Sequence, residues 1–295
     1  FPQSTVNINS LQEYGEKAFK VDDEKPYTGR VFDLYKSTGE KKLEGYYKNG
    51  LKNGKWKWWS ATGIKDSLGT YKNGNRHGKW TFWYDSGVLL GEQKWKNGMA
   101  DGLFAKWYEN GEKESEETFK GGVKDGLWTF WYENGQKDIE GTYKDGEEDG
   151  LHTMWYENGQ KGEEGTYKDG KEDGLFTSWH INGDTLQMLN YYEGRIINEW
   201  TFDYDYYENG QKESERTHKD GRRHGLWTDW YENGQKRIEG NYRDGEHTDI
   251  WTSWDSLGVE HSASDWFSKG YDADENNEYD KAISFYLRAI ELNPD

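Results

Sequence analysis

Cysteine is absent from this chain of 295 residues, and proline occurs only three times. Without cysteine, disulfides and thiolate metal sites are excluded. Aliphatic side chains are also scarce, since hydrophobic residues make up 32% of the chain while aromatics alone reach 17%. The mean hydropathy of −1.25 is correspondingly low. A conventional two-layer aliphatic core is therefore not expected.

Long apolar runs and basic clusters are missing as well. The longest apolar stretches are too short to span a bilayer, so we expect no membrane insertion. Lys and Arg total 38 against 56 Asp and Glu, which gives a net charge of −18. A chain without a basic stripe does not neutralise phosphates, so nucleic acid is excluded as a partner, and anionic membrane surfaces are disfavoured.

What the chain has in abundance is a repeat. An aromatic residue that opens a phrase such as Trp-Tyr-Glu-Asn-Gly-Gln-Lys recurs every 24 residues, with one longer step of 27 residues after Trp179. Such self-similarity is typical of repeat architectures, and it predicts an array of ten copies. The opening aromatic residues are Tyr35, Trp59, Trp83, Trp107, Trp131, Trp155, Trp179, Tyr206, Trp230 and Trp254.

The turn signals of one copy, Leu127 to Gly150, indicate what each unit is. The aromatic, β-prone start of the copy predicts a strand, and Asn134-Gly135 predicts a type I′ turn, in which both residues have a positive φ. Asp145-Gly146 predicts a second turn of the same kind before the next copy. Each repeat is therefore expected to be one β-hairpin, joined to the next by another tight turn.

A turn at Asn134-Gly135 also predicts the pairing register. Trp128 then faces Gly141, where the missing side chain leaves room for the indole, and Trp131 faces Asp138 on the opposite face of the sheet. Residues 180–205 lose the phrase, and we expect a bulge, a kink or a longer loop there. The predicted fold class is mainly β, an elongated single-layer antiparallel sheet of tandem hairpins with a short C-terminal α-helical pair.

The phrase Gly-Leu-Trp-Thr-x-Trp-Tyr-Glu-Asn-Gly-Gln-Lys resembles the MORN-type repeat, in the variant found in bacterial proteins often labelled YwqK-type antitoxins. The resemblance covers roughly residues 26–260, and the opening from Asp23 to Gly29 is similar to the lead-in of such arrays. It implies a β-hairpin array used for binding or scaffolding, with no catalytic residues. The antitoxin label belongs to the repeat family as a whole and not to any residue that contacts a toxin.

After Gly258 the glycine turns stop, and the remaining residues resemble a tetratricopeptide repeat of two helices. One such copy cannot bury its own apolar face. It therefore either caps the sheet or continues into further helical repeats. We predict a lead-in or cap at 1–29, the hairpin array at 30–260 and the helical hairpin at 261–295. The residues that carry the helical resemblance are Trp266, Gly270, Ala282, Tyr286, Ala289 and Pro294.

Three functions fit these features, and none is enzymatic. A scaffold for protein partners is favoured, because the long sheet is accompanied by a helical repeat; the partner's identity is not encoded in the chain. Carbohydrate binding is the alternative, since rows of exposed aromatics stack on sugar rings, and antitoxin-type neutralisation is a third. The candidate binding ladder comprises Trp59, Trp83, Trp107, Trp131, Trp155, Trp179, Trp230 and Trp254.

No catalytic, cofactor or metal site is predicted. The seven histidines show no partner spacing, and the acidic runs lack the glycine pattern of calcium-binding loops. The start Phe1-Pro2-Gln3 lacks an initiator methionine and is read as the start of a mature chain. Export, to the periplasm or outside the cell, is therefore favoured over the cytoplasm.

Overall fold

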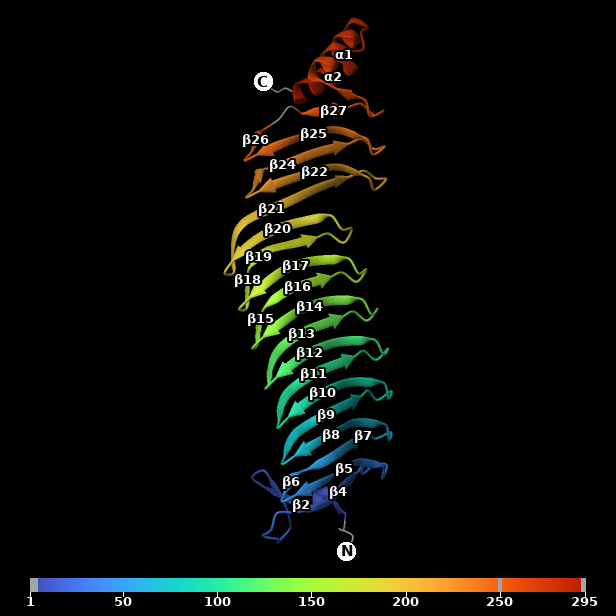
Figure 1. Cartoon of the computed structure of the whole chain (residues 1–295). Coiled ribbons are helices and arrows are strands. Elements are labelled where there is room, and N and C mark those ends of the chain that lie inside the picture. The colour runs from blue at the N-terminus through green and yellow to red at the C-terminus, as the bar shows by residue number, and fades with distance from the viewer. Residues whose placement is uncertain (1–4, 249–250, 293–295) are drawn as a thin grey trace. The chain divides into compact units, whose positions relative to one another are not determined.

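The structure is a computed structural model that describes residues 5–248 and 251–292. The chain divides into two units, residues 1–172 and 173–295, which are described separately below. From residue 29 onward the strands of each unit follow one another in chain order, as the colours of Figure 1 show. The predicted fold class is confirmed, because both units are open antiparallel sheets of tandem hairpins and two helices follow the last strands.

The turn within each repeat differs from the predicted type. Between β13 (Val123–Trp131) and β14 (Lys137–Lys144), the Tyr132 N–H donates to the Gln136 carbonyl oxygen at 2.9 Å and closes a three-residue loop. Only the glycine of the Asn134-Gly135 pair has a positive φ, of 82°. The prediction of a two-residue type I′ turn was therefore wrong, because a type I turn followed by a left-handed glycine satisfies the same sequence.

The three-residue loop changes the register at the start of the return strand. Trp131 pairs with Lys137 and not with Asp138, so that prediction was wrong too; Asp138 is the extra residue of a β-bulge. Beyond the bulge the predicted register holds, and Trp128 pairs with Gly141.

The turn between repeats has the predicted chemistry. Asp145 and Gly146 have φ of 51° and 94°, and Lys144 pairs with Glu147 across them. Both central residues are left-handed, as a type I′ turn requires.

Unit 1 begins with a short strand that pairs in parallel with β4, at Val6↔Val31, and continues as antiparallel hairpins. A separate small hairpin, β2 and β3, follows a 3-10 turn at Ile8–Ser10. Besides β13 and β14, its strands are β1 (Val6–Asn7), β2 (Leu11–Tyr14), β3 (Lys17–Lys20), β4 (Gly29–Leu34), β5 (Lys41–Lys48), β6 (Leu51–Lys52), β7 (Gly54–Trp59), β8 (Lys65–Lys72), β9 (Asn75–Trp83), β10 (Leu89–Lys96), β11 (Met99–Trp107), β12 (Lys113–Lys120), β15 (Glu147–Glu148), β16 (Gly150–Trp155), β17 (Lys161–Lys168) and β18 (Lys171–Glu172).

Unit 2 continues the same hairpin pattern and ends in the two helices. Its elements are β19 (Gly174–Trp179), β20 (Thr185–Tyr192), β21 (Arg195–Tyr206), β22 (Lys212–Lys219), β23 (Arg222–Arg223), β24 (Gly225–Trp230), β25 (Lys236–Arg243), β26 (Glu246–His247), β27 (Thr252–Trp254), β28 (Glu260–His261), α1 (Ala263–Glu275) and α2 (Tyr279–Leu292).

The irregular region predicted at 180–205 is a bulge and not a longer loop. A register shift lies between Asn190 and Tyr191, and Glu193-Gly194 forms an ordinary tight turn. The extra residues of this repeat are taken up by β21, which is 12 residues long. A strand that lengthens keeps its backbone groups paired, which a longer loop does not.

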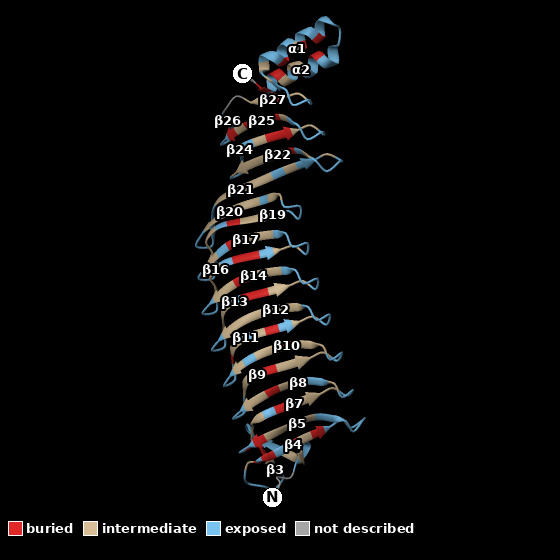
Figure 2. Ribbon diagram, turned by 45° about the vertical axis from the view of Figure 1, so that its right-hand side comes forward, coloured by how far each residue is buried: buried red, intermediate tan, exposed pale blue. Residues whose placement is uncertain are grey.

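One face of the unit 1 sheet, here called the inner face, carries the buried tryptophans Trp56, Trp80 and Trp128. Figure 2 shows buried stretches within the strands and exposed turns between them. A Cβ added to Gly69 would lie 2.1 Å from the Trp80 indole, and one added to Gly45 would lie 2.3 Å from Trp56. Glycine at these positions is therefore what lets an indole lie flat on the sheet.

The first residues of unit 1 cover the start of the inner face. Ala18, Tyr27, Val31, Tyr47 and Trp56 form one buried cluster. The buried Ala18 accepts a backbone hydrogen bond from Tyr27 at 2.8 Å. These contacts are consistent with a capping role for the lead-in.

Both helices lie within residues 261–295, where the sequence predicts a helical hairpin. Ser262 and Asp265 form a reciprocal capping box at the start of α1. Gly270 lies against Tyr286 of α2, and an added Cβ would be 2.6 Å from that ring. Pro294, expected to close the second helix, lies outside the described residues.

Candidate functional site

The ladder tryptophans of unit 1 lie on the face opposite the inner face, here called the outer face. In both units, all eight tryptophans of the predicted ladder lie at the C-terminal ends of their strands. They are half-buried rather than exposed. Each pairs with the first residue of the return strand, as Trp59 does with Lys65 and Trp131 with Lys137. Within each unit the structure therefore confirms a repeated tryptophan position, while a binding role for it stays a prediction.

Lysines cover the rings of this ladder in unit 1. The Lys113 ammonium lies 5.2 Å from the centroid of the Trp131 ring, and that of Lys137 lies 5.3 Å from Trp155. The same ammonium groups pair with glutamates, as Lys137 does with Glu140 at 2.6 Å. A cation over an indole contributes about 0.5–1 kcal/mol at an exposed site. These rings therefore already have a cation as a partner.

The residues that follow the ladder tryptophan join one repeat to the next. The Tyr132 hydroxyl donates to the Trp155 carbonyl oxygen at 2.7 Å, and the Asn134 amide donates to the Glu157 carbonyl oxygen at 2.8 Å. Burial, with the nearby Asp138 carboxylate, raises the pKa of Tyr132 to about 12, so the hydroxyl remains a donor at neutral pH. The Trp-Tyr-Glu-Asn phrase is thus a device for fastening repeats together.

A different environment lies where the helical pair meets the last hairpins of unit 2. Trp266 of α1 is buried against Ile238, Ala289 and Leu292. Its indole N–H donates to the hydroxyl of Ser253, which is fully buried. The helices are therefore packed onto the sheet by an apolar contact with one internal hydrogen bond.

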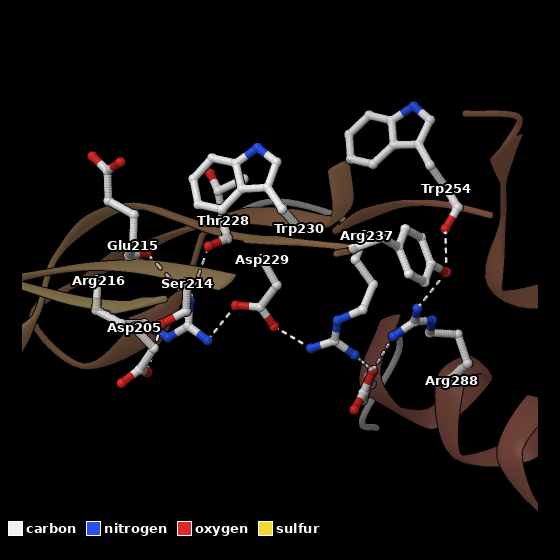
Figure 3. Close-up of polar contacts among 12 residues, drawn as sticks. Asp205, Ser214, Glu215, Arg216, Thr228, Asp229, Trp230, Arg237, Trp254 and Arg288 are labelled. Carbon is white, nitrogen blue, oxygen red and sulfur yellow. Dashed lines mark hydrogen bonds and ion pairs between the residues drawn. The ribbon is translucent and has the colours of Figure 1, made fainter. Parts of the chain in front are cut away.

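Charged residues surround this junction, and Figure 3 shows how they connect. The buried Asp229 carboxylate lies between the guanidinium groups of Arg216 and Arg237 and pairs with both. Arg237 also lies 3.9 Å from the Glu291 carboxylate of α2. A buried carboxylate needs such partners, because an unpaired charge in the interior is costly.

Arg288 completes the connection between α2 and the array. It pairs with Glu291 at 3.3 Å, and it donates to the Tyr231 hydroxyl at 2.9 Å. That hydroxyl in turn donates to the Trp254 carbonyl oxygen at 2.9 Å. In unit 2, the tyrosine that joins the repeats at Trp230 and Trp254 is thus hydrogen-bonded directly to α2.

Two neighbouring hollows adjoin α2, and they share Ile290. One has a volume of about 480 Å³ and lies between the sheet aromatics Trp227, Tyr242 and Trp251 and the α2 side chains Leu287 and Ile290. The other has a volume of about 610 Å³ and is lined by residues of both helices, including Phe267 and Tyr286. Volumes of this size and an apolar lining with a few charged groups are typical of binding sites.

The walls of these hollows expose large apolar side chains. Leu287, Ile290 and Phe267 are 57%, 58% and 60% exposed. Leu287, Ile290 and the charged residues around Asp229 were not among the sites predicted from the sequence. A signal was present, because the copy at Trp227 reads Trp-Thr-Asp-Trp where the copy at Trp128 reads Trp-Thr-Phe-Trp.

Within residues 5–248 and 251–292, no group of three or more His, Asp or Glu side chains is placed to hold a metal ion. In the same part of the chain, neither helix is long and apolar enough to cross a membrane.

The sequence profile of one family, described as a MORN repeat variant, matches the chain seven times. The matches together span about half of the chain, at residues 52–73, 76–97, 100–120, 124–145, 148–169, 204–220 and 223–244. The chain belongs to the MORN repeat variant family. Membership of the MORN family indicates a repeat scaffold of the kind that binds proteins or membranes.

Other comparisons add little to this assignment. A comparison with curated proteins finds no match. A porin-like protein from Bacteroides uniformis is 10% identical over 75% of this chain and 93% of its own, with a TM-score of 0.15. A Tc holotoxin pore from Photorhabdus luminescens is 10% identical over 83% of this chain but only 14% of its own, with a TM-score of 0.17.

A third structure, of TcdB2-TccC3, is 11% identical over 82% of this chain and 14% of its own, with a TM-score of 0.15. TM-scores this low carry no functional argument.

Proposed function

We propose that this MORN repeat chain is a non-enzymatic scaffold that binds a protein partner at the junction of its sheet and its helical pair. The observation that carries the proposal is the exposed apolar surface of Leu287, Ile290 and Phe267 beside an aromatic-lined hollow. Apolar patches of this kind on soluble proteins mark interaction sites. The net charge of −18 favours a protein partner over an anionic membrane.

The tetratricopeptide resemblance supports the same proposal. The close packing of Gly270 on Tyr286 and the buried Trp266, Ala282 and Ala289 are the contacts that the resemblance implies. We propose that the helical pair acts as such a unit and presents its outward side chains to the partner.

Carbohydrate binding through the ladder receives less support. The rings of Trp131 and Trp155 each carry a lysine ammonium at 5.2–5.3 Å. A sugar ring would have to displace an ion pair before it could stack. The antitoxin role stays a prediction of the resemblance alone.

Site-specific crosslinking tests the protein-binding proposal. A photoreactive phenylalanine placed at position 287 of the full chain is expected to yield one saturable protein adduct. Excess unlabelled chain should compete for this adduct, and the Leu287→Asp/Ile290→Asp variant should compete about tenfold less well, as for central interface residues.

The matched control for the competition is Leu226→Asp, because Leu226 is 46% exposed in the same unit but lies on β24, outside both hollows. Equal competition by all three chains would refute the site. Saturable binding on a glycan array, lost on Trp131→Ala, would instead favour the carbohydrate alternative.

A further inference from the structure

On the inner face of unit 1 a second aromatic position lies two residues beyond each of Trp56, Trp80 and Trp128. We call Trp58, Phe82 and Phe130 the aromatic column. The Trp58 ring lies 5.8 Å from Trp56, Phe82 lies 6.1 Å from Trp80, and Phe130 lies 5.6 Å from Trp128. Lys106 occupies the equivalent place in β11, between Phe82 and Phe130. The column therefore lacks one rung.

The side chains beside this missing rung are also small. Gly91 pairs with both Phe82 and Lys106, and Ser115 pairs with Lys106 from the other side. In the β14 copy the equivalent residue is Ile139. A Cβ added to Gly91 would meet only the Ala105 carbonyl oxygen, at 3.2 Å, whereas Gly45 and Gly69 lie tightly under indoles. Gly91 thus places no side chain where other copies hold one.

The result is a hollow of about 340 Å³ on the inner face. Phe82, Leu90 and Phe104 supply its apolar walls. The Phe104 ring packs against Trp95 and Phe119, whose ring centroids are 5.3 Å and 4.7 Å away. One wall is therefore a firmly packed aromatic side chain.

The polar groups of the hollow are already engaged at its rim. The Lys106 ammonium pairs with Glu114 at 2.6 Å, and Glu117 pairs with Lys124 at 2.5 Å. The Gln93 side chain accepts from the Trp95 indole at 3.2 Å. The rim thus places one cation beside an apolar space but leaves no unpaired charge that would demand an ionic ligand.

We propose that this hollow binds one aromatic ring, supplied by a side chain of a partner polypeptide. A ring seated between Phe82 and Phe104 replaces the missing rung of the column, and its edge contacts the ammonium of Lys106. Aromatic pairs at centroid distances of 4.5–7 Å contribute about 0.5–1.5 kcal/mol beyond burial, and a nearby cation adds to this. The inference rests on the proposed function only for the polypeptide source of the ring.

The test uses the full chain and a small probe, N-acetylphenylalaninamide, followed by NMR. The probe is expected to shift the amide signals of residues 82, 91 and 104. N-acetylcyclohexylalaninamide, with the same size but no aromatic ring, is expected to bind roughly fivefold more weakly. Equal binding of the two probes would overturn an aromatic-specific site, and shifts confined to other residues would overturn its location.

Variants that fill the hollow provide the second arm. Lys106→Phe restores the rung and is expected to weaken probe binding about tenfold, and Gly91→Ile fills the same space from β10. The matched control is Met154→Phe, because Met154 occupies the place in β16 that Lys106 occupies in β11 and lies outside the hollow. Unchanged binding in a folded Lys106→Phe or Gly91→Ile variant would refute the proposal.

A third experiment tests whether the bound ring belongs to a polypeptide or to a free aromatic molecule. A phenylalanine-containing peptide that binds more tightly than the amide supports a polypeptide partner, whereas tighter binding of a free aromatic such as indole overturns that part of the proposal. Loss of the junction site through Leu287→Asp/Ile290→Asp should leave probe binding unchanged, so the failure of this inference and that of the proposed function are separately visible.

Discussion

The two faces of the unit 1 sheet use tryptophan in different ways. Trp56 and Trp59 lie in the same strand, three residues apart and on opposite faces. Trp56 is 1% exposed and lies flat over Gly45, whereas Trp59 is half-buried and carries the Lys41 ammonium 5.2 Å from its ring. The difference follows from the preceding strand β5, because its Gly45 permits burial of Trp56 against the backbone and its Lys41 supplies a cation to Trp59.

The largest effect is expected when the inner tryptophan is removed. Trp56→Ala should lower the free energy of unfolding by roughly 3–5 kcal/mol, since a fully buried indole leaves a cavity. Trp59→Ala should cost only about 1–2 kcal/mol, from partial burial and a lost cation contact. Urea unfolding with hydrogen exchange measures both. Equal losses would show that the faces are energetically alike.

The next effect concerns the glycine beneath the indole. Gly69→Ala places a Cβ 2.1 Å from the Trp80 ring and should cost roughly 1–3 kcal/mol through overpacking. Gly91→Ala is the control in the neighbouring hairpin, where only a carbonyl oxygen lies near. We expect the thermal midpoint of the control to stay close to that of the unaltered chain. A similar drop in both variants would mean that strand glycines matter for flexibility and not for indole packing.

A smaller effect is expected on the fastening between repeats. Tyr132→Phe removes the hydroxyl that donates to the Trp155 carbonyl oxygen and should cost about 1 kcal/mol. Amides of β16 should lose protection from hydrogen exchange before those of β9. Tyr143→Phe is the comparison, because its hydroxyl lies 3.4 Å from Glu148 and makes a weak contact. A larger loss in Tyr143→Phe would contradict this ranking.

The smallest effect is a pH dependence confined to the inner face. His152 occupies the inner-face position that Trp128 holds in the preceding repeat. It is buried between the rings of Trp128 and Tyr167. Burial lowers its pKa, against the opposing carboxylates of Glu148 and Glu163. The unfolded chain therefore binds a proton more readily, so stability is complete above pH about 6.5 and declines as the pH falls below that value.

His152→Phe should remove this pH dependence while keeping an aromatic residue at this position. Amide exchange in β16 and β17, measured at neutral and mildly acidic pH, tests it. A decline of equal size in the variant would assign the pH dependence to other groups.

The sequence was sufficient to predict the hairpins, the inner register and the indole over Gly141, because period and glycine spacing are local signals. It did not reveal the type of the Asn134-Gly135 turn, since a two-residue and a three-residue loop accept the same residues. The bulge at Asp138 depends on that loop and was missed with it.

The candidate sites were harder to predict, because they depend on departures from the repeat. The lysine over Trp131 comes from Lys113 of the preceding copy, 18 residues earlier, and no local pattern announces that contact. Arg237 and Gly91 differ from their counterparts in other copies, and comparing copies position by position would have identified them. A binding site in an array is most visible where the repeat is broken.

In six places a tyrosine hydroxyl donates a hydrogen bond to the backbone carbonyl oxygen of the ladder tryptophan in the next repeat. These hydrogen bonds all run in the same direction and join residues 23 or 24 positions apart. Excision of one whole 24-residue copy therefore brings a donor back to an acceptor, whereas excision of a different length leaves both without partners. Gene duplication and loss in whole copies can then lengthen or shorten the array without redesigning any contact. The number of repeats becomes a quantity that evolution can adjust.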